Sequence, residues 1–152
     1  MKDYVLDAMR RQGRLLALDL QSRAADMTSS ELYAEIDYIP DFTEAVKTKN
    51  MMERTADMKN GFVCKTSAGL IVRLIQNYDS DVYTAEPEEL DAQWGYVWSN
   101  DPAKALPFVS LATSPYYVGN CGTENGNTYR SKMDNNVHAP SAYPEGWEEI
   151  AV

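Results

Sequence analysis

The chain has 152 residues, of which 44% are hydrophobic and 24% are charged. This composition excludes an intrinsically disordered protein, and the length is enough for one ordinary domain or for two very small ones. The net charge of −9 is uneven, because residues 1–26 carry a balance of +1 and residues 27–152 a balance of −10. An acidic body repels phosphate backbones, so we expect no nucleic-acid partner.

The cysteines and the N-terminal pattern bear on where the protein works. Cys64 and Cys121 stand far apart and there is no CxxC pair, which argues against a disulfide framework and against a zinc site. We predict two free, buried thiols in a reducing environment. Charges recur through the N-terminal MKDYVLDAMRRQGRLL, so no signal-peptide core is present, and no segment approaches the roughly 20 apolar residues that span a bilayer. We therefore expect no membrane association.

The N-terminal segment, residues 2–25, has the pattern of an amphipathic helix. Leu15 and Leu18 fall outside its main apolar sector. Two interpretations stay open: the helix packs on its own domain and leaves these leucines exposed, or it contacts a second chain through a second apolar strip. From the second we predict that residues 1–26 mediate self-association or binding to a larger assembly. The main apolar sector consists of Val5, Leu6, Met9, Leu16, Ala17, Leu20, Ala24 and Met27.

A second helix is predicted to begin after Thr28, because Thr28-Ser29-Ser30-Glu31 is a capping box. In this motif the threonine hydroxyl accepts a backbone hydrogen bond and the glutamate reaches back. Pro40 ends the second helix, and Asp41 repeats the capping pattern at the start of a short third helix that runs toward Lys49. We interpret residues 1–60 as a helical docking or oligomerisation region that ends in a connector from Asn50.

A change of pattern marks residues 61–112, which we predict to be a central mixed α/β segment. Two strand-like runs, 62–66 and 70–76, flank a turn of hairpin length at Ser67-Ala68-Gly69. The second run is apolar on both faces apart from Arg73, so we expect it to be covered on both sides.

The rest of the central segment is less regular. Residues 87–90 and 101–105 each place a proline where a helical turn begins. Between them, Trp94, Tyr96 and Trp98 alternate as the side chains of a strand do.

Residues 113–152 are predicted to form a small β module. Glycine and asparagine recur at close spacing, and Asn125-Gly126 is a strong signal for a type I′ hairpin, whose two central residues need positive φ. Residues 127–133 leave this turn, and residues 147–150 fit a last strand. The predicted fold class is α+β, with N-terminal helices, a central mixed segment and a C-terminal three-stranded antiparallel module.

The aromatic, glycine, asparagine and proline residues of this module follow a fixed order. They are Tyr117, Gly119, Asn125-Gly126, Tyr129, Asn136, Pro140 and Trp147. In this order residues 113–152 resemble the small chitin-binding type 3 and cellulose-binding modules of bacterial glycosidases, and resemble even more the copies found on phage and prophage tail proteins. The chain departs from that pattern at His138, where related modules often carry an aromatic residue, and at Cys121, where they commonly carry valine.

The resemblance implies two groups of aromatic residues. A module of this size buries little core, so large rings must supply much of it, and we predict Tyr117, Tyr129 and Trp147 as its structural core. Glycan binding needs exposed rings that stack on sugar faces, and Tyr116, Tyr143 and Trp147 are the candidates. Tyr116 and Tyr117 are adjacent, so in an extended strand one points inward and the other outward.

No catalytic or cofactor motif is evident in the sequence. The single histidine, His138, and the lack of a nucleophile-elbow motif argue against Ser/His or Cys/His catalysis, and no phosphate-loop or dinucleotide fingerprint occurs. The acidic run at 86–91 beside Trp94 has the composition of a glycosidase cleft, but a charged, solvent-facing turn explains it more simply. We predict that the protein is not an enzyme and has no cofactor and no metal site.

The resemblance implies a phage or prophage tail or virion accessory protein. Residues 1–26 would dock on virion proteins or self-associate, and the β module would reach a cell-surface glycan or a neighbouring subunit. One alternative is a purely structural virion or assembly protein that binds no glycan. Another is a fragment of a carbohydrate-active enzyme, against which the Met1 start and the missing signal peptide argue. We expect the protein in the virion, or in the host cytoplasm before assembly.

Overall fold

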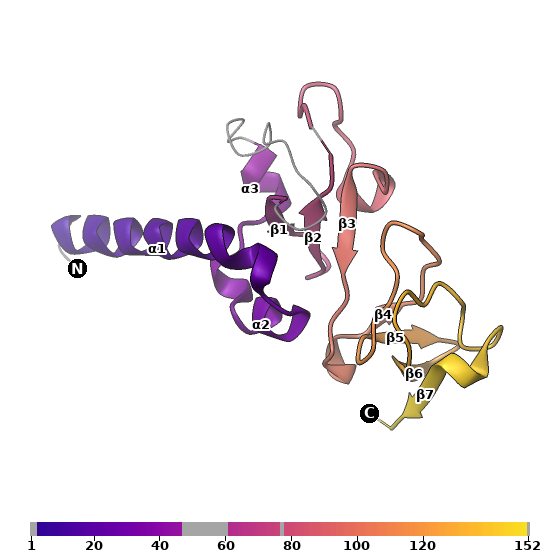
Figure 1. Ribbon diagram of the computed structural model, residues 1–152. Coiled ribbons are helices and arrows are strands. Elements are labelled where there is room, and N and C mark those ends of the chain that lie inside the picture. The colour runs from indigo at the N-terminus through magenta and orange to yellow at the C-terminus, as the bar shows by residue number, and fades with distance from the viewer. Residues whose placement is uncertain (1–2, 47–60, 77, 152) are drawn as a thin grey trace.

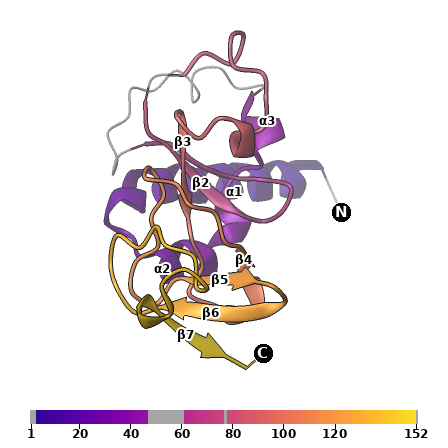
Figure 2. The same cartoon turned by 90° about the vertical axis from the view of Figure 1, so that its right-hand side faces the viewer.

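The helices come first in the chain and the strands follow, which confirms the predicted α+β class (Figure 1). The computed structural model describes residues 3–46, 61–76 and 78–151. Within them the strands form one sheet of three strands and one of four. Figure 2 shows the two sheets one above the other, with α1 behind the first. The connector predicted from Asn50, and the end of the third helix toward Lys49, lie outside the described residues.

The helical region begins with one long helix and continues in short ones. The long helix and the starts of the next two agree with the sequence patterns. Figure 1 shows the N-terminal part of the long helix extending away from the rest of the protein. The elements are α1 (Asp3–Arg23), a 3₁₀ turn η1 (Ala24–Asp26), α2 (Ser29–Ala34), a 3₁₀ turn η2 (Ile36–Tyr38) and α3 (Phe42–Val46).

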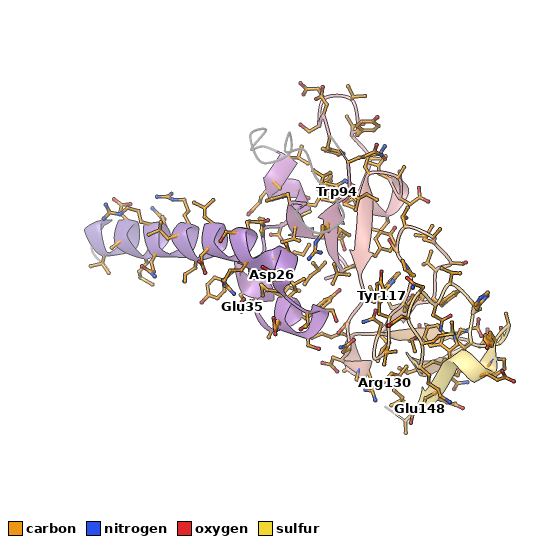
Figure 3. The ribbon with its side chains drawn as sticks, viewed as in Figure 1. Asp26, Glu35, Trp94, Tyr117, Arg130 and Glu148 are labelled. Atoms are coloured by element: carbon orange, nitrogen blue, oxygen red, sulfur yellow. The ribbon has the colours of Figure 1, made fainter. Side chains whose placement is uncertain are left out.

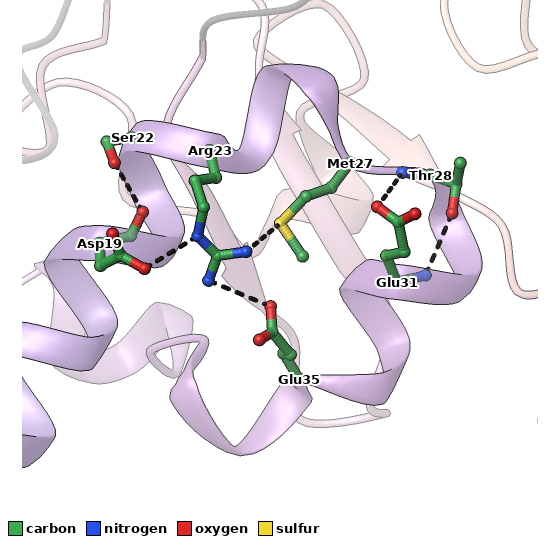
Figure 4. A network of polar contacts seen from close by, with 7 residues as sticks. All are labelled: Asp19, Ser22, Arg23, Met27, Thr28, Glu31 and Glu35. Carbon is green, nitrogen blue, oxygen red and sulfur yellow. Dashed lines mark hydrogen bonds and ion pairs between the residues drawn. The ribbon is translucent and has the colours of Figure 1, made fainter.

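A network of polar contacts holds the corner between α1 and α2 (Figure 4). The Glu31 backbone N–H donates to the Thr28 hydroxyl at 3.2 Å, and the Thr28 N–H donates to the Glu31 carboxylate at 3.3 Å, which confirms the predicted capping box. Arg23 donates to Asp19 at 2.8 Å and to Glu35 at 3.4 Å. These ion pairs are exposed and screened by water, so they set the direction of the corner more than they stabilise it.

The first sheet is covered on both faces. Val63 and Ile71 pack into a core with the helical region, while Cys64, Val72 and Leu74 pack into a second core on the opposite face. This arrangement confirms the expectation that the second apolar run, residues 70–76, is covered on both sides. The sheet is antiparallel in the order β1-β2-β3, with β1 (Val63–Lys65), β2 (Ile71–Leu74) and β3 (Trp94–Val97). Its helical side is covered by Leu20, Ala24, Leu32, Tyr33 and Ile39.

The second sheet has four strands where the sequence predicted three. The additional strand, β4, contains two residues of the predicted central segment and pairs in parallel with β5, whereas the other pairs are antiparallel. A strand this short has no side-chain period to detect, which is why the pattern missed it. The boundary expected between 112 and 113 therefore divides one sheet. Its strands are β4 (Leu106–Pro107), β5 (Cys121–Glu124), β6 (Asn127–Ser131) and β7 (Trp147–Ile150).

The turn between β5 and β6 is the hairpin that the sequence predicted. Asn125 has a φ of 52° and Gly126 a φ of 82°, so both central residues are left-handed as a type I′ turn requires. A Cβ at position 126 would meet nothing within 4 Å, so only backbone strain limits substitution there.

Gly126→Val is expected to lower the free energy of unfolding by about 1 kcal/mol or more, because a β-branched residue resists positive φ. Gly126→Asn is the matched control, since asparagine visits the left-handed region readily and should cost less. Urea unfolding followed by tryptophan fluorescence measures both. A valine variant as stable as the asparagine variant would contradict the assigned turn.

Candidate functional site

Tyr116 lies at the centre of the aromatic core that joins the central segment to the C-terminal module. Its ring stacks on Trp98 at a centroid distance of 4.3 Å and on Phe108 at 5.3 Å, and it meets Trp147 edge-on at 5.2 Å. The residue is 0% exposed. The expectation that Tyr116 faces solvent is therefore wrong, because both faces of its ring are already covered.

The backbone of Tyr116 is also hydrogen-bonded within the fold. Tyr116 and Asn136 exchange two backbone hydrogen bonds, at 2.9 and 2.8 Å. The Asn136 side chain is fully buried, donates to Ser131 at 3.1 Å and to the Gly146 carbonyl at 3.3 Å, and accepts from the His138 N–H at 3.1 Å. Asn136, part of the sequence pattern of the module, is thus a structural amide with its polar atoms satisfied.

Two other predicted aromatic positions pack inside the module. Trp147 is 5% exposed, and its indole N–H donates to the His138 carbonyl at 2.8 Å. It has the predicted core position and is not available to stack on a sugar. Tyr129 is half-buried against the same cluster. Tyr143 is half-buried and meets the His138 ring edge-on at 5.5 Å. The predicted stacking set Tyr116, Tyr143 and Trp147 therefore contains two buried rings.

Tyr117, predicted as core, is the exposed member of the adjacent pair, at 49%. It lines a cleft of about 430 Å³ between the α1–α2 corner, the first sheet and the loop before β5. Figure 3 shows Tyr117 between the helices and the second sheet. Tyr96 and Val118 also line the cleft. The walls of the cleft come from segments far apart in the sequence, so no local sequence pattern predicts the cleft.

The amide groups of the cleft are used to hold its walls together. Asn120 accepts from the Tyr117 N–H at 2.8 Å and donates to the Asn100 side chain at 2.7 Å. We call the part of the chain that contains the two sheets, residues 61–76 and 78–151, the β body. Asn100 in turn donates to the Ser30 hydroxyl at 3.0 Å, which connects the β body to α2. Tyr117 and the neighbouring Val118, which is 60% exposed, supply exposed apolar surface in the cleft. Arg73 and the hydroxyl residues Thr28, Ser29 and Thr113 also line it.

The acidic residues at 86–91 lie on an exposed turn. Glu86, Glu88, Glu89 and Asp91 are all exposed around the 3₁₀ turn η3 (Pro87–Glu89), and none has a hydrogen bond or ion pair through its side chain among the described residues. We call these four side chains the acidic turn. Trp94 is 0% exposed, so the tryptophan that suggested a glycosidase cleft lies in the core and does not face these carboxylates from a binding surface.

The outward side of α1 carries an uncovered strip. Arg11, Arg14, Leu15 and Leu18 follow the spacing of one helical face, and all four are exposed. We call them the outer strip. Leu15 is 62% exposed and Leu18 58%, whereas Leu20 of the same helix, on the opposite side, is 1% exposed against the first sheet. The prediction that the two leucines fall outside the packed sector is confirmed.

The described residues contain no group of metal-ligating side chains and no helix long and apolar enough to cross a bilayer. The buried ionisable groups lie inside the fold. Burial raises the pKa of Tyr33 to about 12, while its hydroxyl donates to the Val97 carbonyl and accepts from the Ile71 N–H. Cys64 and Cys121 are free and buried, as predicted.

Comparison with known proteins finds no match to the chain among family profiles, curated proteins or solved structures. The likeness of residues 113–152 to carbohydrate-binding modules therefore stays a prediction.

The two thiols are expected to be unreactive in the folded protein. Burial raises the pKa of the Cys64 and Cys121 thiols, so little thiolate is present at pH 8 and reagents have poor access. Thiol titration should detect two groups in the denatured, unreduced protein and react slowly before denaturation. Rapid reaction of the native protein would contradict the buried positions in β1 and β5, and detection of no thiol after denaturation would indicate a disulfide.

Proposed function

We propose that the protein is a structural accessory of a phage or prophage particle, a tail or virion protein that attaches through α1 and holds its β body away from the attachment point. The order of residues in the C-terminal module supports the phage setting. The observation that carries the attachment is the outer strip, which stays uncovered while Leu20, on the opposite side of α1, packs on the protein's own core.

Exposed leucines on a helix whose other side is already held to the core by Leu20, with Ala24 just beyond its end, favour a binding role. The packed face already holds the helix to the protein, so Leu15 and Leu18 contribute nothing to that packing. Burying each fully against a partner contributes about 1.5–3 kcal/mol. Met9, at 58% exposed, and Leu16, at 37%, belong to the main apolar sector on the other side of the helix and are not part of the outer strip. A specific interface needs about 1,200 Å² or more of total buried area, and a helix of this length is able to supply one side of it.

Leu15→Gln/Leu18→Gln is expected to reduce self-association or particle binding by about tenfold or more, because it removes apolar area from the outer strip. Thermal stability should be unchanged, since neither leucine packs on the body. Light scattering over a concentration series measures mass, and circular dichroism measures stability.

Leu20→Gln is the contrasting variant, because it lies on the packed face and should destabilise the fold. Equal mass and equal particle binding for wild type and the double variant would contradict attachment through α1. Truncation of residues 1–26 is a poorer test, because it also removes Leu20 and Ala24 from the core.

Glycan binding by the β body is the second candidate, and the exposed ring of Tyr117 favours it. An exposed tyrosine face beside a cleft offers the apolar surface on which a sugar ring stacks. The other predicted rings do not form a platform with it, since Tyr116 and Trp147 are buried and Tyr143 lies outside the cleft, against His138. A single stacking ring gives weak binding per molecule, about millimolar, which display of several copies on a particle would raise by avidity.

Tyr117→Ala should abolish retention of a multimerised protein on cell-wall polysaccharide if that candidate holds, because it removes the exposed ring. Tyr143→Ala is the matched control, a tyrosine-to-alanine change outside the cleft, and should retain binding. Cell-wall pull-down with glycan-array screening measures both. Failure of the wild type to bind any glycan leaves the purely structural assembly protein as the function.

A further inference from the structure

We propose that the outer strip of α1 binds the acidic turn of a second copy of this chain. The inference rests on the proposed attachment through α1 and names its partner. Arg11 and Arg14 of one copy would face carboxylates of the next, while Leu15 and Leu18 beside them would be covered.

The outer strip combines positive charge with apolar side chains. Arg11 and Arg14 have no ion pair with any described residue, whereas Arg10, one turn away, pairs with Asp7 at 3.5 Å. Arginine is suited to such contacts, because its planar guanidinium binds a carboxylate through two hydrogen bonds. The strip therefore fits a surface that offers carboxylates close together.

The acidic turn is such a surface on the same chain. Its four carboxylates fall within six residues, and the backbone beneath them is held in place: the Glu89 N–H donates to the Glu86 carbonyl at 2.9 Å, and the Tyr96 hydroxyl donates to the Glu88 carbonyl at 3.2 Å. A fixed turn loses less conformational entropy on binding than a flexible one.

The two surfaces cannot meet within one molecule. Leu20 and Ala24 pack α1 against β1 and β2, and Gln21 exchanges hydrogen bonds with the Val63 backbone at 2.7 and 3.0 Å. The acidic turn is joined to β3, on the far side of β2 from β1. Figure 1 shows the free end of α1 and the β3 edge on opposite sides of the molecule. The carboxylates that Arg11 and Arg14 face in this proposal therefore belong to another copy.

The salt dependence of self-association distinguishes this contact from a purely apolar one. Two copies with a net charge of −9 each repel one another, so salt strengthens an association that depends on leucines alone. A contact between arginines and carboxylates weakens with salt, because screening acts on the attraction itself. We expect self-association to weaken by about tenfold between about 50 mM and about 500 mM NaCl.

Charge exchange between two full-length variants tests the pairing. Arg11→Glu/Arg14→Glu and Glu88→Lys/Glu89→Lys should each weaken self-association by about tenfold or more, since each places like charges across the contact. Mixed in equal amounts, the two variants should associate again, because each strip then faces a turn of opposite charge. Analytical ultracentrifugation of the separate and mixed proteins measures this.

Glu145→Lys/Glu149→Lys is the matched control, because it makes the same charge change at exposed residues of the C-terminal module. It should leave the salt-dependent association in place. A monomeric wild type, or a mixture that fails to associate, overturns the proposal. If both charge variants associate normally while Leu15→Gln/Leu18→Gln does not, α1 remains the attachment helix and the acidic turn is not its partner.

Discussion

The packing of the β body depends on the stack of aromatic rings around Tyr116. Trp98 comes from the end of the first sheet, Phe108 follows β4, and Trp147 begins β7, so one ring contacts side chains from three separate segments. Aromatic rings bury a large area each and pair with specific geometry, which lets few residues supply a core. Gly122 in β5 leaves room for this ring, since a Cβ there would lie 3.2 Å from it. This cluster packs the end of the first sheet against the second sheet.

The first sheet must be apolar on both faces, because it separates two cores. Alternation along β1 and β2 directs Val63 and Ile71 toward α1 and Cys64 and Val72 toward the aromatic core. One face of the C-terminal half of α1, at Leu20 and Gln21, is therefore buried against the first sheet, while the outer strip on the other side is exposed. Hydrogen bonds between Gln21 and the backbone of Val63 fix the rotation of α1 about its axis, and so fix which residues form the outer strip.

Structural features that depend on neighbouring residues were predicted well from the sequence, and contacts between distant segments were not. Helical periodicity placed Leu15 and Leu18 outside the packed sector, and the Asn125-Gly126 pair placed the hairpin, because both depend on neighbouring residues alone. Alternation showed that one of Tyr116 and Tyr117 points inward, but which one depends on Trp98 and Phe108, which reach the module from the central segment. The cleft beside Tyr117 was missed for the same reason, since its walls come from the helical corner, the first sheet and the loop before β5.

The exposed large apolar side chains are unevenly distributed, which agrees with the binding role proposed above. Among the described residues, nine large hydrophobic side chains are exposed; four lie on α1 and two, Tyr117 and Val118, lie side by side in the cleft. Scattered exposure needs no explanation, but concentration on one helix and in one cleft does. The buried amides and indoles of the module, such as Asn136 and Trp147, have their hydrogen bonds inside the fold. The fold therefore holds α1 through Leu20 and Gln21, and places Tyr117 of the cleft directly beside the buried ring of Tyr116.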